Sequence, residues 1–145
     1  MKISTRGEYG LLALVDLATH AGNGPVQALQ IAERQAIPKQ YLDQIMLALK
    51  NARLVTSARG RSGGYSLARS AESISLFDVI TALEGHAEKQ SFRGSGAQRK
   101  NTARSVLHNL WQELDEYAEL ILRNKSLAEI CQACSSAENL VTYDI

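Results

Sequence analysis

Two helical segments follow each other with almost no chain between them. Apolar residues recur at three- and four-residue steps over residues 27–35 and again over residues 38–51, and only Ala36 and Ile37 separate the two runs. Pro38 fits the first turn of the second helix, where a missing backbone N–H costs no hydrogen bond. Two short helices joined so tightly must pack at a steep angle, which is typical of a helix-turn-helix. An ordinary αα-hairpin gives the same periodicity, so this segment alone leaves both interpretations open.

A glycine-rich basic loop follows and favours the helix-turn-helix. The runs LVTSA and YSLAR, at residues 54–58 and 65–69, carry the β-branched and aromatic side chains typical of strands. The three glycines between them supply the backbone freedom that a tight hairpin needs. We therefore predict a β-hairpin wing that carries Arg59 and Arg61 at its tip. A nucleotide-binding loop is the alternative, but the segment lacks the spacing of a phosphate loop and leads into a strand.

Charge is distributed unevenly along the chain. Residues 1–74 contain nine Lys or Arg against five Asp or Glu, whereas residues 75–145 contain seven against ten. No acidic residue occurs from Gln44 to Ala71, where five basic residues gather. Such a stretch is typical of a surface that faces phosphates, although a plain solvent-exposed face has the same composition. The sequence shows no leader and no run of about 18 apolar residues, so we expect a cytoplasmic protein without a membrane partner.

The start of the second helix of the pair is the candidate for reading bases. In a helix-turn-helix, the N-terminal residues of this helix enter the major groove of DNA. Gln can pair with adenine, Lys with guanine, and Asp can accept a hydrogen bond from cytosine. Asp43 also has a local explanation, an ion pair with Lys39 one helical turn earlier. Basic residues at the chain start and the hairpin tip add backbone contacts. The predicted DNA-binding residues are Lys2, Arg6, Pro38, Lys39, Gln40, Asp43, Gln44, Arg59 and Arg61.

A long amphipathic segment covers about residues 104–123. Its apolar residues form a stripe too broad for one exposed helix, and acidic residues occupy the other faces. We expect a helix of a second copy to cover this stripe, which would place two recognition helices about 34 Å apart. Packing on the chain's own wing domain is the alternative. The predicted dimerisation residues are Val106, Leu110, Trp111, Leu114, Tyr117 and Ile121.

Taken together, these segments resemble a known family. The opening MKISTRGEYGLLALVDLA, the helix YLDQIMLALKNARLV, the loop RGRSGGY, the helix SISLFDVITALEG and the later SLAEI are similar to the Rrf-two type of bacterial winged helix-turn-helix transcription regulators, the family of IscR, NsrR and CymR. The resemblance implies a homodimer in which a long helix crosses its partner and which binds a partly palindromic operator. Relatives often place glycine at the position of Ala36, where a left-handed conformation would cost alanine about 1 kcal/mol.

The predicted fold is mostly α-helical with a small β-hairpin wing, as a winged helix-turn-helix domain plus a long dimerisation helix. We assign residues 1–84 to the DNA-binding domain, 85–102 to a flexible loop, 103–125 to the dimerisation helix and 126–145 to a C-terminal helix and tail. The predicted function is sequence-specific transcription regulation on double-stranded DNA, as a repressor. A winged-helix module that binds another protein is the alternative, and an enzyme is disfavoured because no familiar catalytic spacing occurs.

The sensing chemistry departs from the family pattern. Many relatives hold an iron-sulfur cluster with three cysteines in the loop after the ALEG helix, and here that loop contains none. By resemblance, His108 stands where some relatives place a ligand, and Glu8 where others supply a carboxylate. Glu8 has an alternative role as a capping-box partner of Thr5.

The two cysteines are a second candidate for sensing. Cys131 and Cys134 form a C-x-x-C pair, which suits a redox switch or half of a metal site. Plain packing is the alternative, because cysteine also serves as a small apolar residue in a helix. The signal therefore stays open among an iron-sulfur group, thiol chemistry and a regulatory protein partner, such as relatives without a cluster use.

Overall fold

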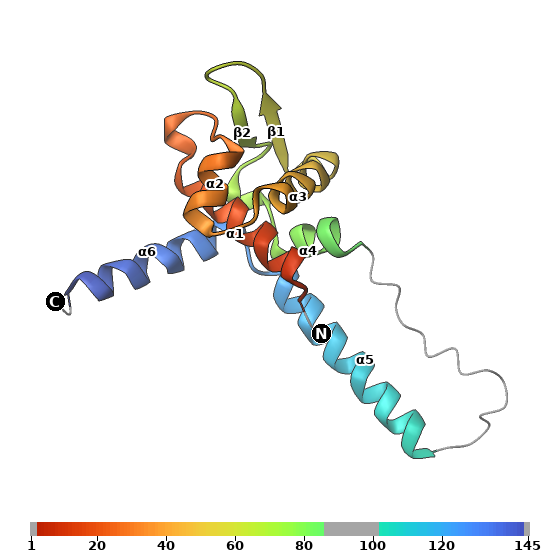
Figure 1. Cartoon of the computed structure of the whole chain (residues 1–145). Helices are drawn as coiled ribbons and strands as arrows, with labels where there is room; N and C mark the ends of the chain where they lie inside the picture. Colours follow the sequence, from red (N-terminus) through yellow and green to blue (C-terminus); the bar gives the residue numbers. More distant parts are fainter. Residues whose placement is uncertain (1–2, 86–101, 144–145) are drawn as a thin grey trace.

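The computed structural model describes residues 3–85 and 102–143. Its elements in chain order are α1 (Thr5–Thr19), η1 (Ala21–Asn23), α2 (Ala28–Gln35), α3 (Lys39–Asn51), β1 (Val55–Ala58), β2 (Gly64–Leu67), η2 (Ala71–Ser73), α4 (Leu76–Glu84), α5 (Thr102–Arg123) and α6 (Leu127–Tyr143). Figure 1 shows α1 to α4 gathered in one body, with the β1–β2 hairpin at one end and α5 and α6 extending away from it. The predicted fold class, mostly α-helical with a small hairpin, is confirmed. Across the described ranges, no helix has the length and apolar content needed to cross a membrane.

A serine cap fixes the start of α1. Ser4 precedes the helix in an extended conformation, and its Oγ accepts a hydrogen bond from the backbone N–H of Gly7 at 3.1 Å. A capping box with Ser4 would need its second member at Gly7, which has no side chain. The alternative role of Glu8 as a capping partner of Thr5 is therefore wrong, and the carboxylate of Glu8 is exposed.

The turn between α2 and α3 contains a strained alanine. Ala36 adopts φ 53° and ψ 44°, in the left-handed region, and Ile37 donates its N–H back to the carbonyl of Ala32 at 3.0 Å. Pro38 takes the N-cap position of α3 with φ −56°, one residue before the first turn where the sequence placed it. Ala32 is buried at the junction, where a small side chain lets the two helices approach closely. The conformation of Ala36 therefore costs some free energy locally, and it sets the angle between the two helices.

Backbone hydrogen bonds join the two strands of the hairpin to each other and also join the hairpin to the helix pair. Strands β1 and β2 are antiparallel and pair from Val55 with Leu67 to Ala58 with Gly64. At the base, Val26 and Tyr65 exchange two backbone hydrogen bonds of 2.9 and 2.7 Å, which tie β2 to the segment before α2. A Cβ at Gly64 would lie 2.5 Å from the carbonyl oxygen of Val26, so this close approach requires glycine. The hairpin and the helix pair therefore form one unit.

One hydrophobic core holds the body together and includes the start of α6. Its fully buried side chains come from α1, α2, α3 and the segments around the hairpin and α4, and Leu127 of α6 is also fully buried among them. Backbone hydrogen bonds of 2.8 and 2.9 Å, from Leu127 N–H to Ile74 and from Leu76 N–H to Lys125, join the corner between α5 and α6 to the chain before α4. The first turn of α6 thus completes the core of the N-terminal body.

Candidate nucleic-acid interface

Helix α3 presents one buried face and one exposed face. Its buried face consists of Leu42, Ile45, Met46 and Leu49, all at 0% exposure. The exposed residues on the opposite side form what we call the outer face of α3: Gln40, Asp43, Gln44 and Leu47. Lys39 is exposed as well, so each of the base-reading candidates predicted from the sequence is on the surface. Leu47 is an addition that the sequence analysis missed, although its spacing from Gln40 and Asp43 indicates the same face.

Lys39 and Asp43 form the local ion pair that was the alternative explanation for the carboxylate. Lys39 Nζ lies 3.0 Å from both carboxylate oxygens of Asp43, and the two side chains are about half exposed. An ion pair this exposed contributes less than about 1 kcal/mol, because solvent screens it. Exchange of these contacts for contacts with bases or phosphates therefore costs little.

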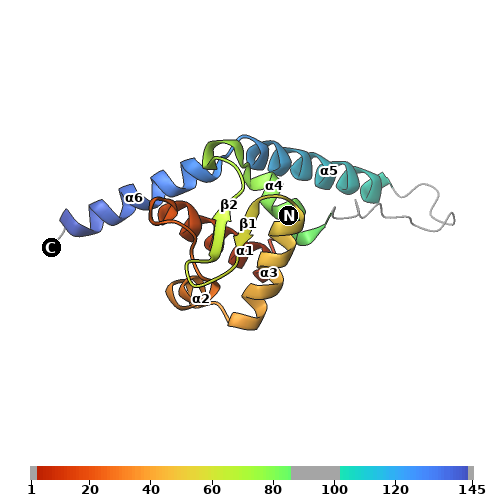
Figure 2. The ribbon, with the colours of Figure 1, turned by 90° about the horizontal axis from the view of Figure 1, so that it is seen from above.

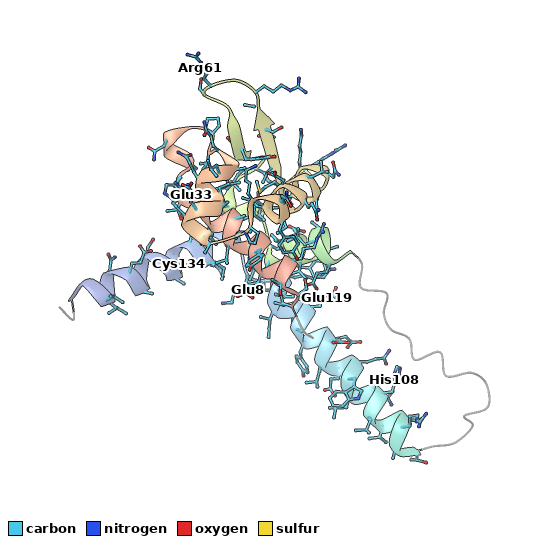
Figure 3. All side chains as sticks on the ribbon, viewed as in Figure 1. Glu8, Glu33, Arg61, His108, Glu119 and Cys134 are labelled. Atoms are coloured by element: carbon cyan, nitrogen blue, oxygen red, sulfur yellow. The ribbon has the colours of Figure 1, made fainter. Side chains whose placement is uncertain are left out.

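The hairpin tip projects two arginines away from the body. Arg59 and Arg61 are exposed, and Figure 3 shows Arg61 at the far end of the loop. In the part of the chain that the structure describes, neither arginine has an acidic partner. Gly60 adopts φ 102°, a conformation that favours glycine, and so turns the chain between the two arginines. These guanidinium groups are free to meet phosphate oxygens or the minor groove.

A buried carboxylate fixes the position of α2 against α1. The side chain of Asp16 is 0% exposed and accepts hydrogen bonds from Arg34 Nε at 2.9 Å and Arg34 Nη2 at 2.7 Å. Gln35 Nε2 donates a third at 3.0 Å, and His20 Nδ1 lies 3.6 Å from the carboxylate. Burial raises the pKa of Asp16, but the hydrogen bonds from Arg34 and Gln35 and the charges of Arg34 and His20 outweigh it, so the net pKa lies below its ordinary value.

The sequence analysis did not identify this buried network, which we call the Asp16 joint (Asp16, His20, Arg34 and Gln35). The signal that was present is a lone acid within the apolar run LLALVDLA. Because α2 packs against both α1 and α3, the joint also helps to hold α3 in place.

The remaining basic candidates lie elsewhere. Arg6 is half-buried in the first turn of α1, and its Nε has no hydrogen-bond partner in the described part of the chain. Figure 1 shows this end of α1 on the side of the body away from the hairpin tip, so the fold does not bring Arg6 together with Arg59 and Arg61. Lys2 lies outside the described residues, as does the predicted flexible loop apart from its ends at 85 and 102.

Helix α5 exposes its apolar stripe. The six predicted dimerisation residues are between 43% and 60% exposed, and the buried residue of the helix is Leu122, at its junction with the body. Figure 2 shows α5 and α6 leaving the body on opposite sides. The alternative, in which the stripe packs on the chain's own wing domain, does not occur in the described residues.

The comparisons with known proteins agree with this geometry. Residues 3–133 match the family Rrf2, described as an iron-dependent transcriptional regulator. The HTH-type transcriptional regulator IscR of Yersinia pseudotuberculosis is 37% identical over 131 residues, which are 90% of this chain and 79% of that protein. This chain belongs to the Rrf2 family. It is a DNA-binding transcriptional regulator, so the predicted family and general function are confirmed.

Two solved structures of relatives are similar to the structure of this Rrf2 regulator. The IscR of T. potens has a TM-score of 0.77 and 38% identity, and the match covers 94% of this chain and 90% of that one. CymR, described as the global cysteine regulator of B. subtilis, has a TM-score of 0.76 and 31% identity, with coverage of 92% and 98%. The family and these neighbours are transcription regulators rather than enzymes.

The description of the family raises the question of an iron site. Among the described residues, no three His, Cys, Asp or Glu side chains lie close enough to hold a metal ion. Figure 3 shows Glu8, His108 and Cys134 on three different helices, with His108 and Cys134 far apart. Iron-sulfur clusters are held by thiolates gathered around the iron, and both cysteines of this chain lie in α6. The described residues of one chain therefore do not fit such a cluster.

The two cysteines have different environments. Cys131 is half-buried against the core, whereas Cys134 is exposed. Burial, with a smaller contribution from the neighbouring Cys134, raises the pKa of the Cys131 thiol, which keeps it protonated at neutral pH. Cys131 therefore packs on the core, and Cys134 is the more accessible thiol of the pair.

Proposed function

We propose that this Rrf2 regulator binds a partly palindromic operator as a homodimer and represses transcription. The observation that carries the proposal is the outer face of α3 beside a hairpin with Arg59 and Arg61 at its tip, in a stretch without acids from Gln44 to Ala71. In this arrangement α3 enters the major groove, where Lys39, Gln40, Asp43 and Gln44 meet base edges, and the hairpin arginines contact the backbone or the minor groove. Its place is the cytoplasm, where bacterial DNA lies, and it performs no catalysis of its own.

The exposed stripe of α5 supports the dimer. A continuous apolar surface of this kind is costly in water, and a second copy of the same helix supplies a matching surface. Two-fold symmetry then gives two copies of α3 about one DNA turn apart. The assignment of residues 1–84 to DNA binding and 103–125 to dimerisation is part of this proposal, with one change: α6 contributes Leu127 to the core of the DNA-binding body.

The dependence of DNA affinity on salt tests the role of the hairpin. Loss of one phosphate contact lowers the slope of log affinity against log salt by about one, so Arg59→Ala should bind every duplex more weakly and with a smaller slope. Lys125→Ala is the control, because Lys125 is a similarly exposed cation at the corner between α5 and α6. Equal slopes for the wild type and Arg59→Ala would remove the hairpin from the interface.

A footprint separates this function from the alternative of a protein-binding module. A regulator of the proposed kind protects one defined sequence. Its Asp43→Ala variant should change the base preference at one position of that sequence. A module that binds an acidic protein would show no preferred sequence at any salt concentration.

The signal that this regulator senses is the second part of the proposal. We propose a regulatory protein partner or thiol chemistry at Cys134 ahead of an iron-sulfur cluster, because the donor residues of one chain do not come together. Purification without oxygen, followed by a visible spectrum and assays of iron and acid-labile sulfide, tests this order. Stoichiometric iron and sulfide would reverse it and direct substitutions to Glu8, His108, Cys131 and Cys134.

A further inference from the structure

Leu47 lies on the outer face of α3 among polar residues. Its side chain is 58% exposed, whereas the leucines on the opposite face of the same helix, Leu42 and Leu49, are fully buried. Gln40, Gln44 and Leu47 follow each other at steps of four and three residues, so they share one stripe that points away from the core. Among the described residues, Leu47 is not part of the core, so core packing does not explain a leucine here.

Single exposed leucines are common on protein surfaces, so exposure alone indicates no contact. The position of Leu47 is what distinguishes it. From Gln40 to Leu47 the helix rises about 10 Å, and the major groove is about 12 Å wide, so the whole stripe fits in one groove. The surroundings match DNA, since Lys50 and Arg53 follow directly and no acid occurs until Glu72.

We propose that Leu47 reads thymine through its C5-methyl group in the major groove. The floor of that groove consists of hydrogen-bond donors and acceptors, and the thymine methyl is its apolar group. A leucine can neither donate nor accept a hydrogen bond, so placed over a polar base edge it would leave that edge without a partner. Over a thymine methyl, both apolar groups leave water together. This inference rests on the proposed function and adds one specificity-determining residue to it.

The test replaces thymine by uracil, which differs from it only in lacking the methyl group. The probe is a duplex selected by the full-length wild-type protein from a random pool, in which each thymine is then exchanged for uracil in turn. At one position per half-site, the exchange should weaken wild-type binding about fourfold, the effect of one buried methyl-sized group. Leu47→Ala should bind the thymine duplex more weakly and show no difference between thymine and uracil there.

Two further variants make the result specific. Leu29→Ala, on α2, removes a leucine of similar exposure (53%) outside the stripe and should respond to uracil as the wild type does. Leu47→Gln keeps the length of the side chain and removes its apolar end, so it should lose the response to the methyl group. Circular dichroism establishes that each variant is folded.

Four results would overturn the inference. Wild type without a uracil-sensitive position, or Leu47→Ala with the full wild-type response, excludes the methyl contact while leaving sequence-specific binding intact. A Leu47→Ala protein that dimerises more weakly in sedimentation assigns Leu47 to a protein contact instead. Wild type that selects no sequence at all would refute the proposed function itself, and this outcome is distinguishable from the other three.

Discussion

Helices α3 and α5 are both amphipathic, and what covers their apolar faces differs. The apolar face of α3 is completely buried by the rest of the body, at 0% exposure for Leu42, Ile45 and Leu49. The apolar stripe of α5 is about half exposed along its length, from Val106 to Ile121. The same periodicity therefore predicts a helix in both cases without saying which molecule covers it. The rest of this chain covers the apolar face of α3, and we propose that a second copy of the chain covers the apolar stripe of α5.

The sharpest test of this difference is to remove one leucine from the covered face. Leu42→Ala should lower the free energy of unfolding by about 3 kcal/mol at any protein concentration, because it leaves a cavity inside one chain. Urea titration followed by circular dichroism measures the loss. Leu47→Ala, on the exposed face of the same helix, is the control and should change the value by less than about 0.5 kcal/mol. Similar losses in both variants would mean that α3 is not held as described.

The body and α5 also differ in how much their ion pairs should contribute to the free energy of unfolding. Asp16→Asn should lower the free energy of unfolding by about 2 kcal/mol, a figure reduced from that of a fully buried pair because Arg34 is 36% exposed. Glu119→Gln breaks the exposed pair with Arg123 on α5 and should cost less than about 0.5 kcal/mol.

The Asp16 joint also predicts a pH dependence. Because the pKa of Asp16 is lowered in the folded state, its stabilisation is present above the ordinary value of 3.8 and is lost as the pH falls through the folded pKa. The difference between wild type and Asp16→Asn should therefore be constant near neutral pH and shrink below about pH 4. A difference that stays unchanged at pH 2 would contradict the assignment of the charge to Asp16.

A leucine removed from α5 should act through association instead of folding. Leu114→Ala should weaken dimerisation by about 1 kcal/mol for each protomer, which is more than tenfold in the dissociation constant, and leave the unfolding of dilute monomer unchanged. Sedimentation equilibrium at several concentrations measures both states. Gln112→Ala, on the polar side of α5, provides the matched control. A wild-type protein that is monomeric at all concentrations would refute the proposed role of the stripe.

The smallest expected effect lies in the turn between α2 and α3. Ala36→Gly should raise the free energy of unfolding by about 0.5 kcal/mol, because glycine accepts the left-handed conformation and only part of the gain is lost to its flexibility when unfolded. Ala48→Gly, inside α3, should lower it by about 1 kcal/mol. Thermal unfolding resolves these opposite signs, and a loss in both variants would mean that Ala36 is not strained.

Local signals explain why most of the fold could be predicted from the sequence. The periodicity of α3, the proline before it and the glycines of the hairpin each depend on neighbouring residues, and the structure has these elements within one or two residues of the predicted bounds. The left-handed conformation of Arg53 at the end of α3 had no such signal, since arginine rarely adopts it.

Contacts between distant residues account for what could not be predicted. Asp16 is isolated in an apolar run, and its partner Arg34 lies 18 residues further along the chain. Leu127 enters a core whose other members come mainly from the first 83 residues. A sequence pattern indicates which face of a helix is apolar, but only the packed structure shows what meets that face.

The corner between α5 and α6 has a consequence for the choice of operator. Backbone hydrogen bonds from Leu76 and Leu127 fix the direction in which α5 leaves the body. In the dimer that we propose, the separation of the two recognition helices then depends on the register in which two α5 helices meet. A shift of seven residues displaces one body against the other by about 10 Å, the length of about three base pairs. In the proposed dimer, helix α5 would therefore select operators by the spacing of their half-sites without contacting a base.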